Sequence, residues 1–199
     1  MPQHHLITDP YLHEPKGIAT AAEGYVYVSD GVGSGSWRPW PLGKATYQHG
    51  TTGQIISTTA AKLQINGLGA SSNVTRLPRE IRVSGQLWDG VGYKLTPIRI
   101  NDGYLVRIQL PVTAESGTPA TIKLQFDVGG LATPSNSLYE TFVRVGNTTP
   151  YDVSYTTSME IANSLAAANG VTIFCSTNTG TVTLGSPLIY IQKVTDGLL

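Results

Sequence analysis

The chain has little of the chemistry that marks most enzymes and nucleic-acid-binding proteins. Only 13 of its 199 residues are basic and 13 acidic, so the formal net charge is zero. The charged fraction of 13% is about half of the usual level. No stretch concentrates charge of one sign. A neutral chain without a basic stripe lacks the electrostatic footprint of nucleic-acid binding, so we expect no nucleic-acid partner.

Cysteine and long apolar runs are scarce as well. The single Cys175 excludes an intramolecular disulfide and a cysteine-based metal site. It alternates with Val171 and Ile173 on one face, which favours a small buried side chain over a nucleophile. No apolar run approaches the roughly 18 residues that a membrane span needs, so we expect no membrane partner. The start of the chain, Met1–His5, has no apolar core, and we therefore expect synthesis in a cytoplasm without a signal peptide.

No segment predicts a catalytic or cofactor site. The glycine-rich segment Gly31–Ser36 lacks the third glycine, the lysine and the following helix of a phosphate-binding loop, so we expect no cofactor. Histidines 4, 5 and 13 with Asp9 could supply metal ligands, but an extended segment does not hold them at one point, and no metal site is predicted. The carboxylates are scattered, without a pair that suggests glycosidase geometry. We therefore predict that the protein is not an enzyme.

What the chain does contain is unevenly distributed. All four histidines and two of the three tryptophans fall within the first 49 residues. Residues 1–45 are dense in glycine, proline and polar residues, with one strand candidate at Gly24–Val28. Their prolines remove amide donors and hold the backbone extended. Such a segment cannot form a core, so we predict an extended N-terminal arm over residues 1–45 that lies on its own head or on a partner.

The remainder, residues 46–199, predicts a β-sheet head. Apolar and polar residues alternate over 104–112, 122–128 and 151–159, as expected of antiparallel strands with one wet face. The last strand, 188–194, has large apolar groups on both faces, which indicates a central strand or one buried by a second subunit. Strands of this length, joined by tight and longer connections, favour a jelly roll. The predicted fold is all-β: an antiparallel two-sheet jelly-roll sandwich preceded by an extended N-terminal arm.

Residues 46–100 form a transition whose assignment stays open. Glycines punctuate its weaker strand candidates at 53–57, 62–66, 80–84 and 96–100. The helical candidate, 163–169, is short and predicts one turn in a connection between strands. Trp88 either plugs the end of the sandwich or stacks on sugars with Tyr93, and the plug is favoured.

Two resemblances extend this interpretation. Residues 13–37 resemble the N-terminal segment of the capsid decoration (cement) proteins of tailed bacteriophages, through His13-Glu-Pro-Lys-Gly-Ile18, Gly24-Tyr-Val-Tyr-Val-Ser-Asp-Gly31 and Gly33-Ser-Gly-Ser-Trp37. The C-terminal part is similar to trimeric jelly-roll heads of the tumour-necrosis-factor or C1q type, through the pattern of Phe142–Asn147, Gly170–Phe174 and Ser186–Ile191.

The resemblance implies a structural virion protein. Decoration proteins bind the outer surface of the capsid, often as trimers, and clamp neighbouring capsid subunits. The expected partners are therefore the major capsid protein and two further copies of this chain, on the outer capsid surface of the virion. The residues expected to bind the capsid are His13, Glu14, Pro15, Lys16, Gly17, Trp37 and Trp40. Those expected at the trimer interface are Phe174, Tyr190 and Gln192.

Two alternatives stay open. The same kind of head serves as the receptor-binding or glycan-binding tip of a phage tail fibre, in which case a host surface glycan is the partner. A polysaccharide-cleaving enzyme is disfavoured, because no pair of acids is visible in the sequence.

Overall fold

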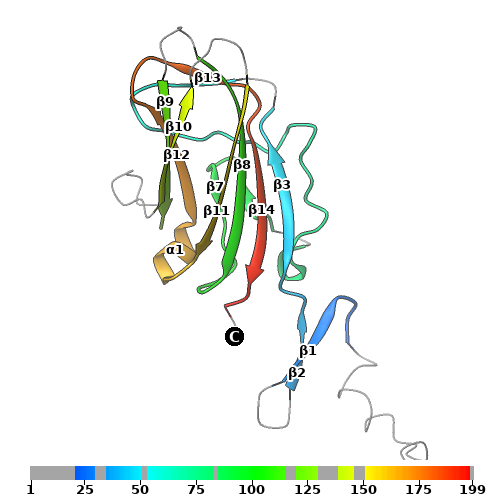
Figure 1. Ribbon diagram of the computed structural model, residues 1–199. Helices are drawn as coiled ribbons and strands as arrows, with labels where there is room; N and C mark the ends of the chain where they lie inside the picture. Colours follow the sequence, from blue (N-terminus) through cyan, green and yellow to red (C-terminus); the bar gives the residue numbers. More distant parts are fainter. Residues whose placement is uncertain are drawn as a thin grey trace, which may run out of the picture. The chain divides into compact units, whose positions relative to one another are not determined.

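The computed structural model describes residues 21–29, 35–50, 53–82, 85–114, 120–129, 139–145 and 151–197 (Figure 1). The chain divides into two compact units, Met1–Pro41 and Leu42–Leu199. The boundary expected between residues 45 and 46 falls inside strand β3 (Gly43–Gln48). Because β3 pairs with β14 (Leu188–Thr195) from Gly43 onward, the whole strand belongs to the second unit.

The described part of the first unit is a two-stranded antiparallel hairpin. Strand β1 (Tyr25–Ser29) matches the strand candidate in the sequence and pairs with β2 (Gly35–Pro39). The rings of Tyr27 and Trp37 meet edge to face, with centroids 5.4 Å apart. A side chain at Gly35 would lie 2.4 Å from the backbone oxygen of Val28 and under 3 Å from the Tyr27 ring, so glycine is required there. None of the described residues of this unit is buried, so the hairpin has no core of its own.

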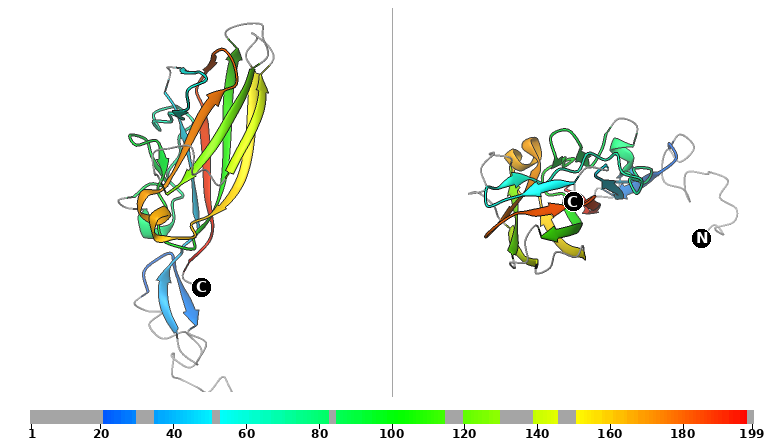
Figure 2. Two further views of the ribbon diagram at one scale, coloured as in Figure 1. Left: turned by 90° about the vertical axis from the view of Figure 1, so that its left-hand side faces the viewer. Right: turned by 90° about the horizontal axis from the view of Figure 1, so that it is seen from above.

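The second unit consists of two antiparallel sheets, which form the two layers visible in Figures 1 and 2. The first sheet contains β3, β4 (Gln54–Ile56), β8 (Gly103–Ala114), β11 (Tyr151–Glu160), β13 (Val182–Leu184) and β14. The second contains β5 (Ala61–Lys62), β6 (Trp88–Asp89), β7 (Lys94–Leu95), β9 (Ala120–Val128), β10 (Tyr139–Val145) and β12 (Val171–Thr177).

The order of pairing identifies the topology. Strand β3 pairs with β14, β5 and β7 pair with β12, β8 pairs with β11, and β9 pairs with β10. Each pair is therefore nested inside the previous one along the chain. Nested antiparallel pairing in two packed sheets is the arrangement of a jelly roll. The predicted antiparallel jelly-roll sandwich is confirmed.

The core follows the alternation seen in the sequence. The inward residues of β8 from Tyr104 to Val112 are all at most 1% exposed, and Ile122, Leu124 and Phe126 of β9 are fully buried. Burying a large apolar side chain contributes about 1.5–3 kcal/mol, so these two strands supply much of the stability of the sandwich. Cys175 is buried as expected, and burial raises the pKa of its thiol.

Strand β14 is central, as its two apolar faces indicated. It lies between β3 and β8, and its residues Ile189 and Ile191 point into the core. The short helix α1 (Ser164–Asn169) connects β11 to β12, and the Asn163 side chain caps it by accepting a 2.8 Å hydrogen bond from the Ala166 amide. No helix in the described part of the chain is long and apolar enough to cross a membrane.

Two strand candidates of the transition region are wrong. A 3-10 turn over Arg79–Ile81 stands where a strand was expected over 80–84, and residues 96–100 form a bend. Pro97 has no amide to donate to a ladder. The amides of Ile98 and Arg99 instead donate to the side chains of Tyr104 and Asp102, at 3.0 Å each. Side-chain acceptors therefore replace a neighbouring strand in this segment.

Trp88 plugs the sandwich. Its side chain is fully buried, and its indole Nε1–H donates a 2.7 Å hydrogen bond to the backbone oxygen of Ile65. This position excludes Trp88 from stacking on a sugar. Tyr93 lies in the adjoining turn, half-buried, with a φ of 55°.

The buried tyrosines predict a loss of stability in alkali. Burial raises the pKa values of both Tyr47 and Tyr104 above the usual 10.0. Their contribution to stability is complete below the unfolded-state pKa and is lost as the pH rises above it, because only the unfolded chain can then release these protons. The midpoint of urea unfolding should therefore fall once the pH exceeds about 10. Tyr47→Phe should reduce this fall in the unfolding midpoint. The prediction would be wrong if tyrosinate absorbance showed that all tyrosines of the folded protein ionise near pH 10.

Candidate interaction face of the sandwich

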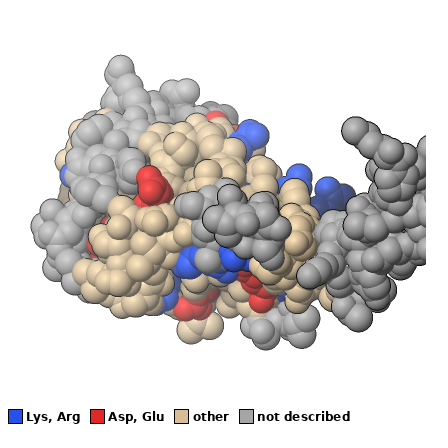
Figure 3. Space-filling model, turned by 90° about the horizontal axis from the view of Figure 1, so that it is seen from below, with Lys and Arg blue, Asp and Glu red and all other residues tan. Residues whose placement is uncertain are grey.

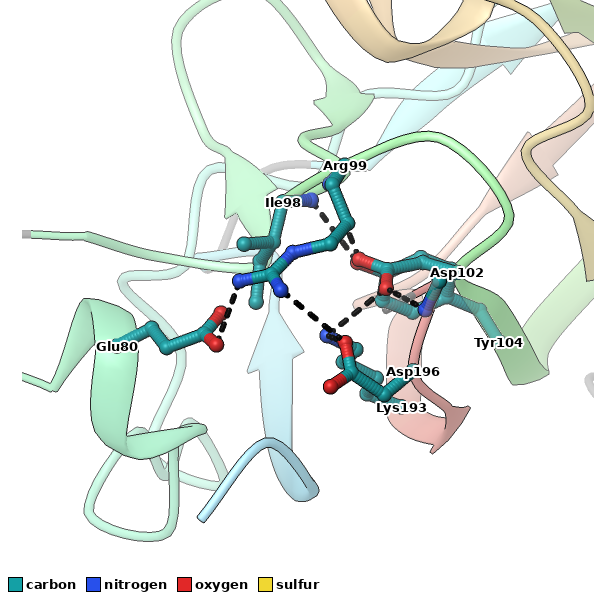
Figure 4. A network of polar contacts seen from close by, with 8 residues as sticks. Glu80, Ile98, Arg99, Asp102, Tyr104, Lys193 and Asp196 are labelled. Carbon is teal, nitrogen blue, oxygen red and sulfur yellow. Dashed lines mark hydrogen bonds and ion pairs between the residues drawn. The ribbon is translucent and has the colours of Figure 1, made fainter. Parts of the chain in front are cut away.

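The most concentrated polar chemistry in the described chain is a buried network around Asp102 (Figure 4). The Lys193 ammonium lies 2.9 Å from Oδ1 of Asp102, and both side chains are fully buried. The same oxygen accepts a 3.1 Å hydrogen bond from the Gly197 amide. Oδ2 accepts hydrogen bonds of 3.0 Å from the Arg99 amide and the Tyr104 hydroxyl. Four donors therefore surround one carboxylate.

The network extends toward the surface through a second acid. Asp196 lies 3.1 Å from the Lys193 ammonium and 3.5 Å from the Arg99 guanidinium, which also pairs with Glu80 at 2.5 Å. A side chain at Gly197 would collide with the backbone oxygen of Ile100, so Gly197 is held closely against the bend before β8.

This network has a structural role. The Asp102 carboxylate already has a donor for each accepting direction, and the pair with Lys193 is closed to solvent. A general acid or base needs contact with a substrate, which a fully buried pair does not have. Within the described residues, no group of three or more histidines, cysteines or acids could hold a metal ion.

The better candidate for function is the outer face of the first sheet. Residues directly opposite one another on antiparallel strands share a face. One such row crosses the sheet from Thr156 on β11 through Arg107 on β8 and Tyr190 on β14 to Thr46 on β3. A further backbone bridge joins Thr46 to Asn73, which widens the face by one segment.

A shallow depression of about 510 Å³ follows this row. Half-buried aliphatic side chains, Leu105 and Leu188, flank the Tyr190 ring in it. Its full lining is Thr46, Leu105, Arg107, Gln109, Thr156, Leu188, Tyr190 and Gln192. The mixture of one aromatic ring, aliphatic carbon and amide or hydroxyl groups suits contact with another macromolecule.

Polar contacts hold the side chains of the depression in place. The Tyr190 hydroxyl donates a 2.9 Å hydrogen bond to Oε1 of Gln192. The Lys44 ammonium lies over the Tyr190 ring, 5.9 Å from its centre. The Arg107 Nε–H donates to the Ser154 hydroxyl at 3.1 Å. A smaller depression of about 170 Å³ adjoins the first and is lined by Lys44, Ala45, Thr46, Asn73, Arg76 and Tyr190.

Charge elsewhere on the described surface is mixed. On the side seen in Figure 3, basic and acidic side chains lie among uncharged residues, and neither sign covers an extended area. No described surface there resembles the continuous basic stripe of a nucleic-acid-binding protein.

The structure brings together two of the three residues predicted at the trimer interface. Tyr190 and Gln192 lie side by side on the outer face of the first sheet. Phe174 lies on β12 in the second sheet, opposite Lys62 and Gln125, and is only 6% exposed. The structure therefore does not place Phe174 beside the other two.

The residues predicted to bind a capsid belong to the first unit. Trp37 is half-buried on β2, and Trp40 just after it is 48% exposed. The segment His13, Glu14, Pro15, Lys16 and Gly17 lies outside the described residues.

Sequence reasoning missed the basic residues of the face. Alternation along 104–112 already indicated that Arg107 points away from the core. What it could not show is which strands lie beside β8, because that depends on the register of β14 and β3. Lys44 and Arg76 therefore join the site only through the pairing of distant segments.

The buried network predicts a large effect of a single substitution. Lys193→Met should lower the free energy of unfolding by about 3–5 kcal/mol, because it leaves the Asp102 carboxylate buried without its cation. Adding Asp102→Asn should restore much of the loss, since the amide oxygen still accepts hydrogen bonds and carries no charge. Urea unfolding of the two variants measures both effects. If Lys193→Met is as stable as the wild type, the buried Asp102 carboxylate does not need the Lys193 ammonium to stay stable in the core.

Comparison with known proteins finds similarity among solved structures only. No family model and no curated protein sequence matches the chain. It is similar to the Eiger TNF of S. frugiperda, with 13% identity over 79% of this chain and 95% of the other, at a TM-score of 0.46. It is similar to the PRD1 vertex protein P5, with 9% identity over 88% of this chain and 85% of the other, at a TM-score of 0.48. A protein of Bacillus endospore appendages, described as disulfide-linked pili, has 13% identity over 78% of this chain and 91% of the other, at a TM-score of 0.35. Because these identities and TM-scores are low, the fold is identified by the strand pairing described above and not by these similarities.

Proposed function

We propose that this chain is a structural virion protein that binds the outer capsid surface as a homotrimer and stabilises contacts between capsid subunits. The observation that carries the proposal is the division of the chain into a hairpin unit without a buried core and a jelly roll with a complete one. The resemblance of residues 13–37 to the N-terminal segment of decoration proteins supplies the partner.

The first unit has the properties of an attachment segment. Its Tyr25, Tyr27, Trp37 and Trp40 are all at least partly exposed, although aromatic residues of this size are usually buried. Tryptophan and tyrosine are the residues that most often anchor an interface. Prolines fix backbone angles before docking, which lowers the entropy lost on binding. The segment His13–Gly17 would contact the capsid beside them.

The second unit has the properties of an assembly domain. Its outer face on the first sheet carries Tyr190 and Gln192, and these two residues are the proposed trimer contacts. Phe174 would contact a neighbouring copy only through its small exposed fraction. Three attachment units on one trimer would raise the overall affinity well above that of a single unit, because the second and third bind from a high effective concentration.

A non-enzymatic role agrees with the charged residues that the structure describes. The Asp102 carboxylate, at the centre of the buried network, has donors on both of its oxygens inside the fold. The lone Cys175 has a raised pKa and is buried, which is the opposite of an activated thiol.

A second candidate function is the receptor- or glycan-binding head of a tail fibre. The depression of about 510 Å³ favours it, because it combines the Tyr190 ring with amide, hydroxyl and guanidinium donors. Such groups stack on sugar rings and bind their hydroxyls. Copy number separates the two functions.

The copy number of this chain per virion should be close to that of the major capsid protein or a simple fraction of it. Quantitative mass spectrometry of purified particles measures the ratio. A decoration protein occupies every equivalent position of the lattice, whereas a fibre head is present only at the tail. A handful of copies per particle would refute the cementing role and favour the fibre.

Removing residues 1–41 should leave a folded, trimeric sandwich that no longer binds capsids. The second unit keeps all of its sheet pairing and its core, so its urea unfolding midpoint should change little. Co-sedimentation of the full and shortened chains with particles stripped of the protein measures binding. Equal binding by the shortened chain would show that attachment does not use the first unit.

A further inference from the structure

Three basic side chains surround Tyr190 on the outer face of the first sheet. Lys44, Arg76 and Arg107 line the two adjoining depressions, and neither lining contains an acidic residue. Among the described residues, none of the three takes part in an ion pair. In a chain whose basic and acidic residues are equal in number, this part of the face is positively charged and uncompensated.

The uncompensated acids lie elsewhere on the same face. Among the acidic side chains of the sandwich whose exposure the structure describes, the exposed ones are Asp152 and Glu160, both on β11. Strand β11 pairs with β8 and is the edge strand of the first sheet. Both acids are an even number of residues from Thr156, which lines the depression, so they share its face. The face is therefore positive toward β3 and negative along β11.

Because the charges are separated, contacts between two copies through this face differ in energy with their relative orientation. A two-fold contact centred on Tyr190 would bring Arg107 of one copy beside Arg107 of the other, and like charges at an interface are unfavourable. A contact that lays the β11 edge of one copy across the basic part of the next joins opposite charges. Such a head-to-tail contact uses two different surfaces of the chain, and repeated around an axis it closes into a ring.

We propose that the depression around Tyr190 is occupied by β11 of a second copy of this chain, with its Asp152 or Glu160 carboxylate paired to Lys44, Arg76 and Arg107. The inference rests on the homotrimer of the proposed function and adds which surfaces join and in which sense. Leu105, Leu188 and the Tyr190 ring supply the apolar area of the contact. Charge pairing selects the orientation and the partner.

Charge reversal on each side tests the pairing. Lys44→Glu with Arg107→Glu should weaken trimer formation by the full-length chain at least about tenfold, and Asp152→Lys with Glu160→Lys should do the same. Combining the four substitutions should return the dissociation constant to within about threefold of the wild type, because opposite charges face each other again. Light scattering and sedimentation over a dilution series measure the constants. Arg82→Glu is the matched control, since it reverses an exposed cation that lines neither depression and should not change the dissociation constant.

Salt gives an independent measurement. Raising the ionic strength from about 0.1 M to 1 M shortens the screening length from about 10 Å to 3 Å, so the wild-type trimer should weaken. The two charge-reversed variants should instead associate more strongly in salt, because their facing charges repel each other. Circular dichroism of each variant shows that it is folded.

The outcomes separate the pairing from the homotrimer. A chain that stays monomeric at low salt and high concentration overturns both. A trimer that ignores salt and charge reversal overturns the pairing and leaves the homotrimer standing. If the wild-type trimer binds heparin, and Lys44→Glu with Arg107→Glu abolishes that binding without dissociating the trimer, the occupant is an acidic glycan and the pairing between copies is wrong.

Discussion

The ion pair between Lys193 and Asp102 joins the two strands around which the first sheet is built. Lys193 lies near the end of β14 and Asp102 directly before β8, and these strands are central neighbours in the sheet. The charges are closed to solvent, so removing Lys193 would leave the Asp102 carboxylate buried without a cation. The bend before β8, the end of the chain and the Tyr104 hydroxyl all attach to the same carboxylate. That arrangement joins the ends of β8 and β14 in the register that their pairing shows.

The two units of the chain are stabilised in different ways. The sandwich buries two continuous apolar faces against each other and is complete in itself. The hairpin has aromatic and aliphatic side chains on its two faces, of which none is buried, so further stabilisation must come from contact with something else. The core of the sandwich therefore contains no residue of the hairpin.

The regular strands could be predicted because their burial repeats every second residue. The stripe from Tyr104 to Val112 follows from that period alone. The apolar groups on both faces of β14 indicated either a central strand or one buried by a second subunit, and the strand is central. Residues 80–100 could not be predicted, because side chains and not a neighbouring strand accept from several of their backbone amides. Tyr104 and Asp102 accept from Ile98 and Arg99, and Tyr47, 40 residues away, accepts from Leu87. The same limit applied to the site: Tyr190 and Gln192 share a strand, whereas Lys44 and Arg107 meet them only through register. Lys193 was a missed signal, since a charged residue at an inward position of an apolar strand requires a buried partner.

The nested pairing has a consequence for how the chain acquires its structure. Strand β3, the first of the sandwich, pairs with β14, the last, so nearly the whole unit separates the two partners in sequence. Contacts of such long range are slow to form, because the loop between them must close before they contribute stability. A ribosome must also release the final strand before β3 can pair at all. The sandwich is therefore expected to fold as one unit, with its outermost pair closing only after β14 has left the ribosome.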